Sequence, residues 1–255
     1  MIPEQRQQRI AKLIRGLGSI TIGRLEEEFG ISAATARRDL AVLERQGRVR
    51  RTHGGAVLPT LTQQEDSFQQ RLEEAVPAKK RLAHAALTLL EENDTVFIDS
   101  STTAYYAAQR VLAAVQRVTL LTNLVPAMEL LTTVESSNVE LIGMGGSFRG
   151  LTLSLVGPWT VRMVESHLTD KLFFSVRGVT AEGYLTDSNP LEAEVKRAMI
   201  KQAARPVLLV DGRKFERQGL NVIAHVRDVS LVVTADAHRS YTEKLVESGV
   251  EVQSV

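Results

Sequence analysis

From residue 95 onward, short apolar runs of strand length alternate with longer helical stretches, and this alternation limits the chain to few folds. The expected strands are 95–99, 118–122, 139–142, 172–176, 207–211, 230–234 and 250–252. A first helix over 78–92 precedes them, and the later helices are 103–114, 126–133, 158–167, 190–204 and 239–248. Nearly continuous apolar strands joined by crossover helices are buried on both faces. The pattern predicts a doubly wound, mostly parallel α/β domain.

The composition excludes several classes of protein. The chain has 255 residues with 31 Lys and Arg against 30 Asp and Glu, and 44% of its residues are hydrophobic, so disorder is not expected to be its main state. It has no cysteine, which excludes disulfides, thiolate nucleophiles, Fe–S clusters and cysteine-based zinc sites. The opening residues lack the apolar core of a signal peptide, and no run approaches 18 apolar residues. We expect a soluble, cytoplasmic protein with no membrane partner.

Charge is divided unevenly along the chain. Residues 1–58 carry 11 Lys and Arg against 6 Asp and Glu, whereas residues 59–255 carry 20 against 24. A small basic head on a mildly acidic body is typical of a head that meets a polyanion, although a solvated charged surface gives the same counts. We expect a head domain over 1–58, a polar linker over 59–76 and the α/β domain over 77–255.

The head has the pattern of three helices followed by a hairpin. A first helix is expected over 3–15, and a short β-rich link over 19–22 follows it. Thr21 can cap a second helix that ends at Gly30, since glycine tolerates the positive φ found just past a helix end. Ser32 caps a third helix over 33–46, in which Leu40 and Leu43 point inward. Two helices joined by a three-residue turn containing glycine make a helix-turn-helix.

The third helix carries the residues expected to meet DNA. Small side chains at its tip let the backbone approach a groove floor, while Thr35, Arg37 and Arg38 can reach bases and phosphates. Residues 48–57 then predict two short basic strands around a glycine-rich tip, a wing whose arginines lie along the DNA backbone. The candidate DNA contacts are Ser32, Ala33, Thr35, Ala36, Arg37, Arg38, Arg50, Arg51, His53 and Gly54. This ordered set predicts a winged helix-turn-helix that binds double-stranded DNA.

Each of these candidates also has a plainer interpretation. Arg37 and Arg38 can be solvated helix charges, and Arg38 can pair with Asp39 or Glu44. His53 taken alone is more often a structural surface residue than a contact. A lone pair of arginines is a weak signal, so the prediction depends on the order of helix, turn, capped basic helix and basic hairpin.

In a doubly wound sheet, ligands bind outside the carboxyl ends of the strands, so the residues after each expected strand are candidates. The first strand runs into four consecutive hydroxyls at a helix N-terminus, which can cradle a phosphate. The candidate ligand-binding residues are Asp99, Ser100, Ser101, Thr102, Thr103, Asn123, Gly145, Gly146, Glu194 and Lys214, with Lys196 as a further inward-turning possibility. N-capping, an Asx turn and a solvated helix face are the plainer interpretations.

The third helix and the wing contain a recognisable run. Ser32, Thr35, Arg37, Arg38, Asp39 and Leu40 stand at fixed spacing, and Leu43, Glu44, Gly47 and the run Arg51-Thr52-His53-Gly54-Gly55-Ala56 follow. This closely resembles the DNA-binding head of the DeoR family of bacterial transcription regulators, whose usual run is Ser-x-x-Thr-Ile-Arg-Arg-Asp-Leu. Ala36 stands where isoleucine is typical, which shortens a buried side chain and bears on packing rather than on the arginines.

Motifs of the second part are similar to the sensor domain of the same family. They are Asp99-x-Ser101-Thr102-Thr103, Leu121-Thr122-Asn123, Gly145-Gly146, Asp170 through Gly178, Glu194-Val195-Lys196 and Asp211-Gly212-Arg213-Lys214-Phe215. In the last run, Arg213 replaces the usual serine, and this added positive side chain bears on which effector fits. That sensor domain is related to sugar-phosphate isomerases and CoA transferases. The resemblance covers nearly the whole chain and implies a repressor that releases DNA on binding a phosphorylated sugar or similar metabolite.

Two functional hypotheses follow. The first is a DNA-binding regulator with a small-molecule switch, acting as a homo-oligomer that places two heads on successive major grooves. The second is a sugar-phosphate isomerase with an accessory head, for which Asp99, Asp211 and Glu194 supply carboxylates. No cofactor is expected, because Phe148 stands where a dinucleotide-binding motif begun at Gly143 needs glycine. No metal is expected either, because the five histidines are scattered without an i, i+4 pair.

Overall fold

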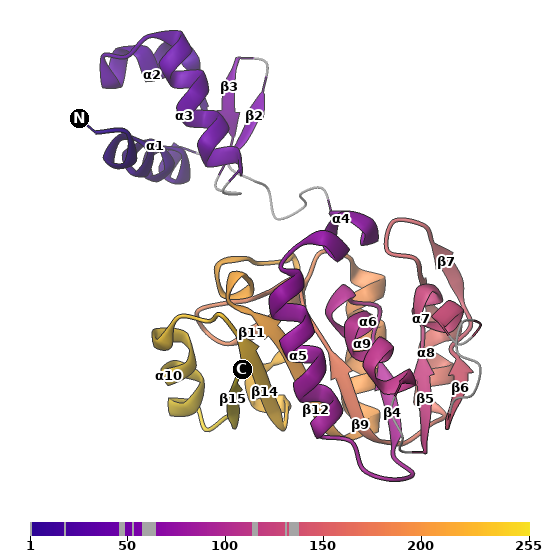
Figure 1. Cartoon of the computed structure of the whole chain (residues 1–255). Coiled ribbons are helices and arrows are strands. Elements are labelled where there is room, and N and C mark those ends of the chain that lie inside the picture. The colour runs from indigo at the N-terminus through magenta and orange to yellow at the C-terminus, as the bar shows by residue number, and fades with distance from the viewer. Residues whose placement is uncertain are drawn as a thin grey trace. The chain divides into compact units, whose positions relative to one another are not determined.

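The computed structural model describes residues 2–17, 19–45, 49–52, 54–57, 65–113, 117–130, 132 and 138–255. The chain divides into two compact units, Met1–Gln63 and Gln64–Val255 (Figure 1). Each unit has apolar core clusters of its own, as is typical of separate folding domains.

The first unit is a winged helix-turn-helix, which confirms the predicted fold. Its elements are α1 (Pro3–Leu17), β1 (Ser19–Thr21), α2 (Ile22–Phe29), α3 (Ala33–Arg45), β2 (Arg50–Thr52) and β3 (Gly55–Val57). The helices pack on one apolar core, to which they contribute Ile10, Ile14, Leu25, Leu40 and Leu43. The three short strands form an antiparallel sheet in the order β1-β3-β2. The end expected for the third helix, at 46–47, lies outside the described residues.

Local contacts fix the turn between α2 and α3. The Thr21 side chain accepts a hydrogen bond from the Arg24 N–H at 3.3 Å and caps α2. Gly30 has φ 59°, the left-handed conformation that glycine adopts without steric cost at a helix end. Ser32 Oγ accepts from the Thr35 N–H at 3.3 Å at the start of α3. The N-terminal end of α3 is therefore positioned by residues close to it in the chain.

The second unit is built on a seven-stranded parallel sheet in the order β15-β14-β12-β9-β4-β5-β6. Its strands are β4 (Thr95–Ile98), β5 (Val118–Thr122), β6 (Val139–Gly143), β9 (Thr169–Phe174), β12 (Ala203–Asp211), β14 (Leu231–Ala235) and β15 (Val252–Ser254). The register aligns Ile98 of β4 with Thr122 of β5 and Phe173 of β9. The carboxyl ends of these three central strands therefore meet at one edge of the sheet.

Helices cover both faces of this sheet (Figure 1). One face carries α5 (Val76–Thr88), α6 (Thr102–Leu112) and α7 (Val125–Leu130), and the other carries α8 (Pro158–Glu165), α9 (Pro190–Gln202) and α10 (Arg239–Glu247). Successive strand residues alternate between the faces: in β12, Val207 and Leu209 join the first core, whereas Leu208 and Val210 join the second. This arrangement confirms the predicted doubly wound α/β fold.

Several shorter elements lie outside the predicted pattern. β7 (Ser147–Arg149) and β8 (Ser154–Val156) form a hairpin, and β10 (Gly178–Val179), β11 (Tyr184–Asp187) and β13 (Asn221–His225) form an antiparallel sheet. The 3-10 helices η2 (Gly212–Glu216) and η3 (Val226–Asp228) are also additional. Elements of two to five residues are too short for a periodic apolar pattern to be detected.

A helix occupies part of the stretch expected to be a linker. α4 (Phe68–Glu73) lies within residues 59–76 and belongs to the second unit. Ser67 and Gln70 form a capping box at its start. The Phe68 side chain is buried and meets the Tyr105 ring of α6 edge-on, with ring centroids 5.6 Å apart. Phe68 thus anchors α4 to the α/β unit, while residues 58–64 lie outside the described residues.

Candidate functional site

The N-terminal half of α3 presents polar side chains on an exposed surface. Arg37 and Arg38 are exposed, and so is Ser32 at the helix start. Ser32 Oγ and Thr35 Oγ1 lie 3.1 Å apart, and Ala33 between them is half-buried. The free N–H groups at a helix start can bind phosphate, and two guanidinium groups nearby can reach base edges. The structure therefore gathers five of the predicted DNA contacts on one short helical segment.

Two residues of the same helix face inward. Ala36 has no exposed surface and packs with Leu40 in the core of the first unit, so its predicted contact with DNA is wrong. The cause is helix periodicity, since Ala36, Leu40 and Leu43 recur every three or four residues on the buried face. Asp39 is also buried, and it accepts a hydrogen bond from Arg6 Nε at 2.6 Å. The Asp39 carboxylate therefore ties α1 to α3.

Both carboxylates considered as partners of Arg38 are engaged by other arginines. Asp39 pairs with Arg6, and Glu44 accepts from the Arg51 backbone N–H at 2.9 Å and from Arg51 Nε at 2.8 Å. The backbone hydrogen bond from Arg51 outweighs burial and lowers the pKa of Glu44. This exposed pair contributes about 1 kcal/mol or less to stability. Arg51 can therefore exchange Glu44 for a DNA phosphate at small cost.

The wing is a two-stranded hairpin that packs against β1. Gly54 is exposed at its tip, and the Gly54 carbonyl accepts from the Ile22 N–H at 2.8 Å. A Cβ at Gly55 would lie 2.0 Å from the Ile20 carbonyl oxygen, so the approach of β3 to β1 requires glycine. Arg50 lies in β2. The predicted contact of His53 falls outside the described residues.

The candidate ligand site of the second unit lies where the strand order reverses. From β4, the sheet continues to β5 on one side and to β9 on the other. The crevice at such a switch point is the usual position of ligands in open α/β sheets. The pocket at this point, which we call the β4–β9 pocket, is lined by Glu65, Arg71, Ser101, Thr102, Thr103, Ser175, Val176, Arg177, Asp187, Ser188, Lys196 and Lys214. It joins residues next to β4, β9 and β11 with residues of α4, α9 and η2.

Three of the four predicted hydroxyls line this pocket. Ser101, Thr102 and Thr103 are buried there, at the start of α6. Ser100 turns elsewhere, because its Oγ donates to the buried Glu192 carboxylate at 2.6 Å. The Ser100 hydroxyl is thus committed to the protein, and the predicted cradle has three members instead of four.

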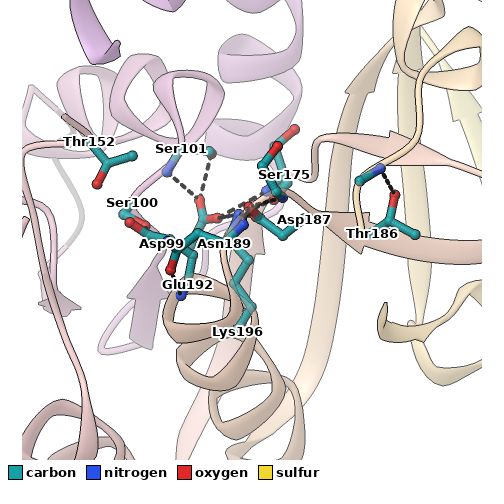
Figure 2. A network of polar contacts seen from close by, with 12 residues as sticks. Asp99, Ser100, Ser101, Thr152, Ser175, Thr186, Asp187, Asn189, Glu192 and Lys196 are labelled. Atoms are coloured by element: carbon teal, nitrogen blue, oxygen red, sulfur yellow. Dashed lines mark hydrogen bonds and ion pairs between the residues drawn. The ribbon is translucent and has the colours of Figure 1, made fainter. Parts of the chain in front are cut away.

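Next to the hydroxyls, two buried carboxylates share one lysine (Figure 2). Lys196 Nζ lies 2.7 Å from Asp187 Oδ2 and 3.3 Å from Asp99 Oδ2, and it donates to the Ser175 carbonyl at 3.0 Å. Burial disfavours the charge of Lys196, but the two carboxylates outweigh burial and raise the pKa of Lys196. Burial raises the pKa of Asp99, whereas the closer contact with Lys196 lowers that of Asp187 against burial. Asp99 also accepts a hydrogen bond from Ser101 Oγ at 2.6 Å, and this bond orients a hydroxyl of the pocket.

The pocket also holds donors that the protein does not satisfy. Within the described part of the chain, Ser175 Oγ and Arg71 Nη2 are buried without a hydrogen-bond partner. Leaving a buried donor unpaired costs about 1–3 kcal/mol. Burial lowers the pKa of Lys214 to about 7, and nearby arginines, among them Arg71 and Arg177, act in the same direction against the carboxylate of Asp211. An anion with several acceptor oxygens would satisfy these donors and favour the charged form of Lys214.

The prediction that Glu194 turns inward is wrong, and the glutamate that does so is Glu192, two residues earlier. Glu194 is exposed, whereas Glu192 is buried and accepts from Ser100 Oγ and Ser154 Oγ, both at 2.6 Å. The cause is helix phase, since Glu192 and Lys196 are four residues apart and lie on one face of α9. The i, i+4 spacing to Lys196 was the signal that could have identified Glu192.

Asn123, Gly145 and Gly146 are not among the residues that line the β4–β9 pocket. Asn123 Nδ2 donates to the Leu155 carbonyl at 2.9 Å and ties the end of β5 to β8. The Gly145 carbonyl accepts from Thr160 Oγ1 at 2.8 Å, and a Cβ at Gly146 would lie 2.0 Å from that same Oγ1. The close approach that Gly146 permits is therefore that of α8.

Arg213, the departure from the resembling family run, lies beside the pocket and does not line it. Its Nε donates to Asp211 at 2.9 Å and its Nη1 to Glu74 at 3.1 Å. Arg213 thus connects the end of β12 to the residue that follows α4. The following Lys214 is the member of this run that lines the pocket.

Sequence reasoning missed Arg71, Ser175, Arg177 and Asp187. Ser175 and Arg177 follow β9, inside the run that ends at Gly178, so the carboxyl end of that strand was a usable signal. Asp187 ends the four-residue β11, whose pattern is too short to detect. Arg71 lies in the stretch expected to be a linker, and nothing local marks it. Its position depends on the packing of α4 against the α/β unit.

Comparison with known proteins gives the same division of the chain. The DeoR-like helix-turn-helix domain matches residues 6–62, and the DeoR C terminal sensor domain matches residues 74–236. The chain is 34% identical to the transcriptional repressor AccR of Agrobacterium fabrum, over 96% of this chain and 94% of that protein. It is 32% identical to the L-fucose operon activator of Escherichia coli, over 90% and 93% respectively. It is 30% identical to the lactose phosphotransferase system repressor of Staphylococcus epidermidis, over 98% of each.

These relatives are transcriptional regulators rather than enzymes, which decides against the isomerase alternative. Among the described residues, no helix is both long enough and apolar enough to cross a bilayer. The two matched domains follow each other in the order that the fold shows, and the relatives align over nearly the full chain. The protein therefore belongs to the DeoR family of transcriptional regulators.

Proposed function

We propose that this protein represses a carbohydrate-metabolism operon in the cytoplasm, and that a phosphorylated sugar or related metabolite in the β4–β9 pocket sets its affinity for the operator. The observation that carries the proposal is the set of donors in the pocket, above all the unpaired Ser175 Oγ and Arg71 Nη2. A phosphate group has acceptor oxygens enough to pair with several donors at once. The names of two relatives mention a sugar, L-fucose and lactose, which supports a sugar for the remainder of the effector.

Repression is favoured over activation because two of the three relatives named above are repressors. The effector can change DNA affinity only by as much as its affinities for two states of the protein differ. We infer that the empty pocket belongs to the state that binds DNA, as in a repressor released by its inducer.

The head is proposed to bind duplex DNA with α3 in the major groove and the wing along the backbone. The contacts from α3 are Ser32, Ala33, Thr35, Arg37 and Arg38, and those from the wing are Arg50, Arg51, His53 and Gly54. One such head reads a short half-site, so a homo-oligomer is proposed to place two heads on half-sites about 34–36 Å apart, or a multiple of that distance.

Salt-dependent DNA titration tests the head. Arg37→Ala and Arg38→Ala are each expected to weaken binding to an operator fragment selected from random DNA, by about tenfold or more. Loss of a phosphate contact reduces the slope of log K against log salt by about 0.9, whereas loss of a base contact relaxes sequence preference and leaves the slope unchanged. Lys12→Ala on the exposed surface of α1 is the matched control. Wild-type affinity in both arginine variants would refute the placement of α3.

A thermal-shift screen with phosphorylated sugars tests the pocket. A ligand present at 100 times its Kd that binds only the folded state stabilises it by about 2.7 kcal/mol. Lys214→Ala is expected to keep operator affinity and to weaken both the thermal shift and the release of DNA. Asp99→Ala is a poorer test, because it also breaks the buried pairing with Lys196. A Lys214→Ala protein that releases DNA at the wild-type effector concentration would overturn this assignment.

A further inference from the structure

The first residues of the second unit form one wall of the β4–β9 pocket. Residues 65–74, which comprise α4 and its flanks and are called the α4 segment, supply Glu65 and Arg71 to the lining. The second unit begins at Gln64, so the α4 segment directly follows the chain that leads from the head. The pocket and that connection therefore share one short element.

The α4 segment is held by Phe68 and Leu72, by hydrogen bonds to its backbone and by several ion pairs. Phe68 is 2% exposed and packs on Tyr105. The ion pairs are Glu65–Arg149, Asp66–Arg177, Glu74–Arg213 and Glu74–Arg217. Their side chains are between 13% and 40% exposed, and the more exposed pairs, those of Asp66 and Glu74, are weak because water screens them. The Asp66 and Glu74 pairs are thus contacts that can exchange partners, whereas the bidentate Glu65–Arg149 pair is more deeply buried.

Only part of the Arg71 guanidinium is engaged by the protein. Its Nε donates to the Asp66 carbonyl at 3.1 Å, while its Nη2 is buried and, among the described residues, has no partner. The lining of the pocket includes Arg71 together with the buried hydroxyl of Ser175, which is 1% exposed and also has no partner in the described part of the chain. A planar guanidinium with an unpaired nitrogen and an unpaired hydroxyl in the same pocket lining can both donate hydrogen bonds to the oxygens of an oxyanion.

We propose that Arg71 binds the anionic group of the effector, and that α4 thereby passes the occupancy of the pocket to the chain that leads to the head. This inference rests on the proposed function, because it needs an anion in the β4–β9 pocket. Without a bound anion, α4 is held by Phe68 and Leu72, by hydrogen bonds to its backbone and by ion pairs of which several can exchange. A bound anion adds charge-assisted hydrogen bonds to the middle of the helix, so α4 is held more firmly against the α/β unit. The backbone from which the connection to the head starts is then more restricted.

Hydrogen–deuterium exchange of the full chain, with and without inorganic phosphate, tests this role. In the wild type, saturating phosphate is expected to slow amide exchange severalfold at residues 99–105 around the hydroxyls and at residues 68–74. In Arg71→Gln, phosphate is expected to bind about tenfold more weakly and, once saturating, to slow exchange at 99–105 but not at 68–74. Arg71→Lys keeps the charge without the planar fork and is expected to fall between the two. Arg81→Gln, on α5 and outside the pocket lining, is the matched control and should behave as the wild type.

The outcomes separate this inference from the proposal on which it rests. Slower exchange at 99–105 without a change at 68–74 in the wild type overturns the role of Arg71 and leaves the anion pocket intact. Slower exchange at 68–74 that persists in Arg71→Gln at saturating phosphate overturns it as well. No change at either segment overturns both proposals. Exchange of the β12 amides without phosphate shows whether each variant has kept its fold, and the Arg71→Lys protein carries the test if Arg71→Gln has not.

Discussion

Replacement of Lys196 by methionine should destabilise the second unit more than any surface change on the same helix. The lysine side chain is 6% exposed, and its partners Asp99 and Asp187 are 1% and 9% exposed. Methionine has a similar volume but leaves two carboxylates close together without their cation. Removing one member of a buried ion pair costs about 3–5 kcal/mol, because the remaining charge is uncompensated. We therefore expect Lys196→Met to lower the free energy of unfolding by about 3–5 kcal/mol at pH 8.

The pH dependence of this loss identifies its cause. In the wild type, Lys196 lowers the pKa of Asp187, so the stability that this carboxylate contributes is present above its unfolded pKa, about 4, and is lost as pH falls further. In Lys196→Met, the folded-state pKa of Asp187 should rise above its unfolded value, and that of Asp99, which burial already raises in the wild type, should rise further. The folded variant then binds a proton that the unfolded chain lacks at pH 5 to 7, so its deficit should shrink as pH falls from 8 to 5.

Urea unfolding of the full chain, followed by circular dichroism and by the fluorescence of Trp159 on α8, the single tryptophan of the chain, measures both effects. Lys201→Met, an exposed lysine of α9, is the control and should change stability by no more than about 0.5 kcal/mol. A loss of less than about 1 kcal/mol at pH 8, with the same pH dependence as the wild type, would refute the reasoning from buried charge.

Three further predictions concern Lys214, Phe68 and the glycines of the head. The pKa of Lys214 is lowered to about 7, so its side chain is mostly protonated at pH 6 and mostly neutral at pH 8. The affinity of the protein for sulfate, measured by isothermal titration calorimetry, should therefore fall up to about tenfold from pH 6 to pH 8. Lys214→Gln should remove this pH dependence. Phe68→Ala should destabilise the second unit by about 3–5 kcal/mol in urea unfolding, and a loss below 1 kcal/mol would contradict its role as the anchor of α4. Gly30→Ala should destabilise the head by about 1–2 kcal/mol because Gly30 has φ 59°. Gly23→Ala inside α2 should instead stabilise the head by up to about 1 kcal/mol. Shifts of the calorimetric unfolding temperature with the same sign in both variants would contradict the argument.

Sequence periodicity predicted the large elements well because burial dictates them. Strands buried on both faces must be apolar throughout, so each of the seven predicted strands corresponds to a strand of the parallel sheet. The predicted strand boundaries were wrong where polar residues lie in the interior. β9 begins at Thr169 rather than at residue 172, and within it Lys171 is buried because it pairs with Asp94 at 2.6 Å. A buried ion pair between segments distant in the chain leaves no local signature.

The candidate site was predicted less completely, for the same reason. The hydroxyl run after β4 was recognisable because its members are consecutive, and three of them reach the pocket. Glu194 was named as a candidate although Glu192 is the buried glutamate, because the phase of a helix depends on what it packs against. Arg71 was not predictable, since its position follows from the docking of α4. Ala36 was assigned to DNA because it lies within the basic run, although the helical repeat with Leu40 points it into the core.

The two sides of the β4–β9 pocket differ in how far their charges are compensated, and the proposed mechanism depends on that difference. On the α9 side, Lys196 is shared by two carboxylates, and Glu192 accepts from two hydroxyls. On the side of α4 and η2, Arg71 has an unpaired nitrogen within the described part of the chain, and positive charges lower the pKa of Lys214. An anion therefore has little to gain from the α9 side and most to gain from the other. Because a ligand shifts an equilibrium only through contacts that differ between its states, its effect should be concentrated at α4, the element next to the connection with the head, and not in the sheet.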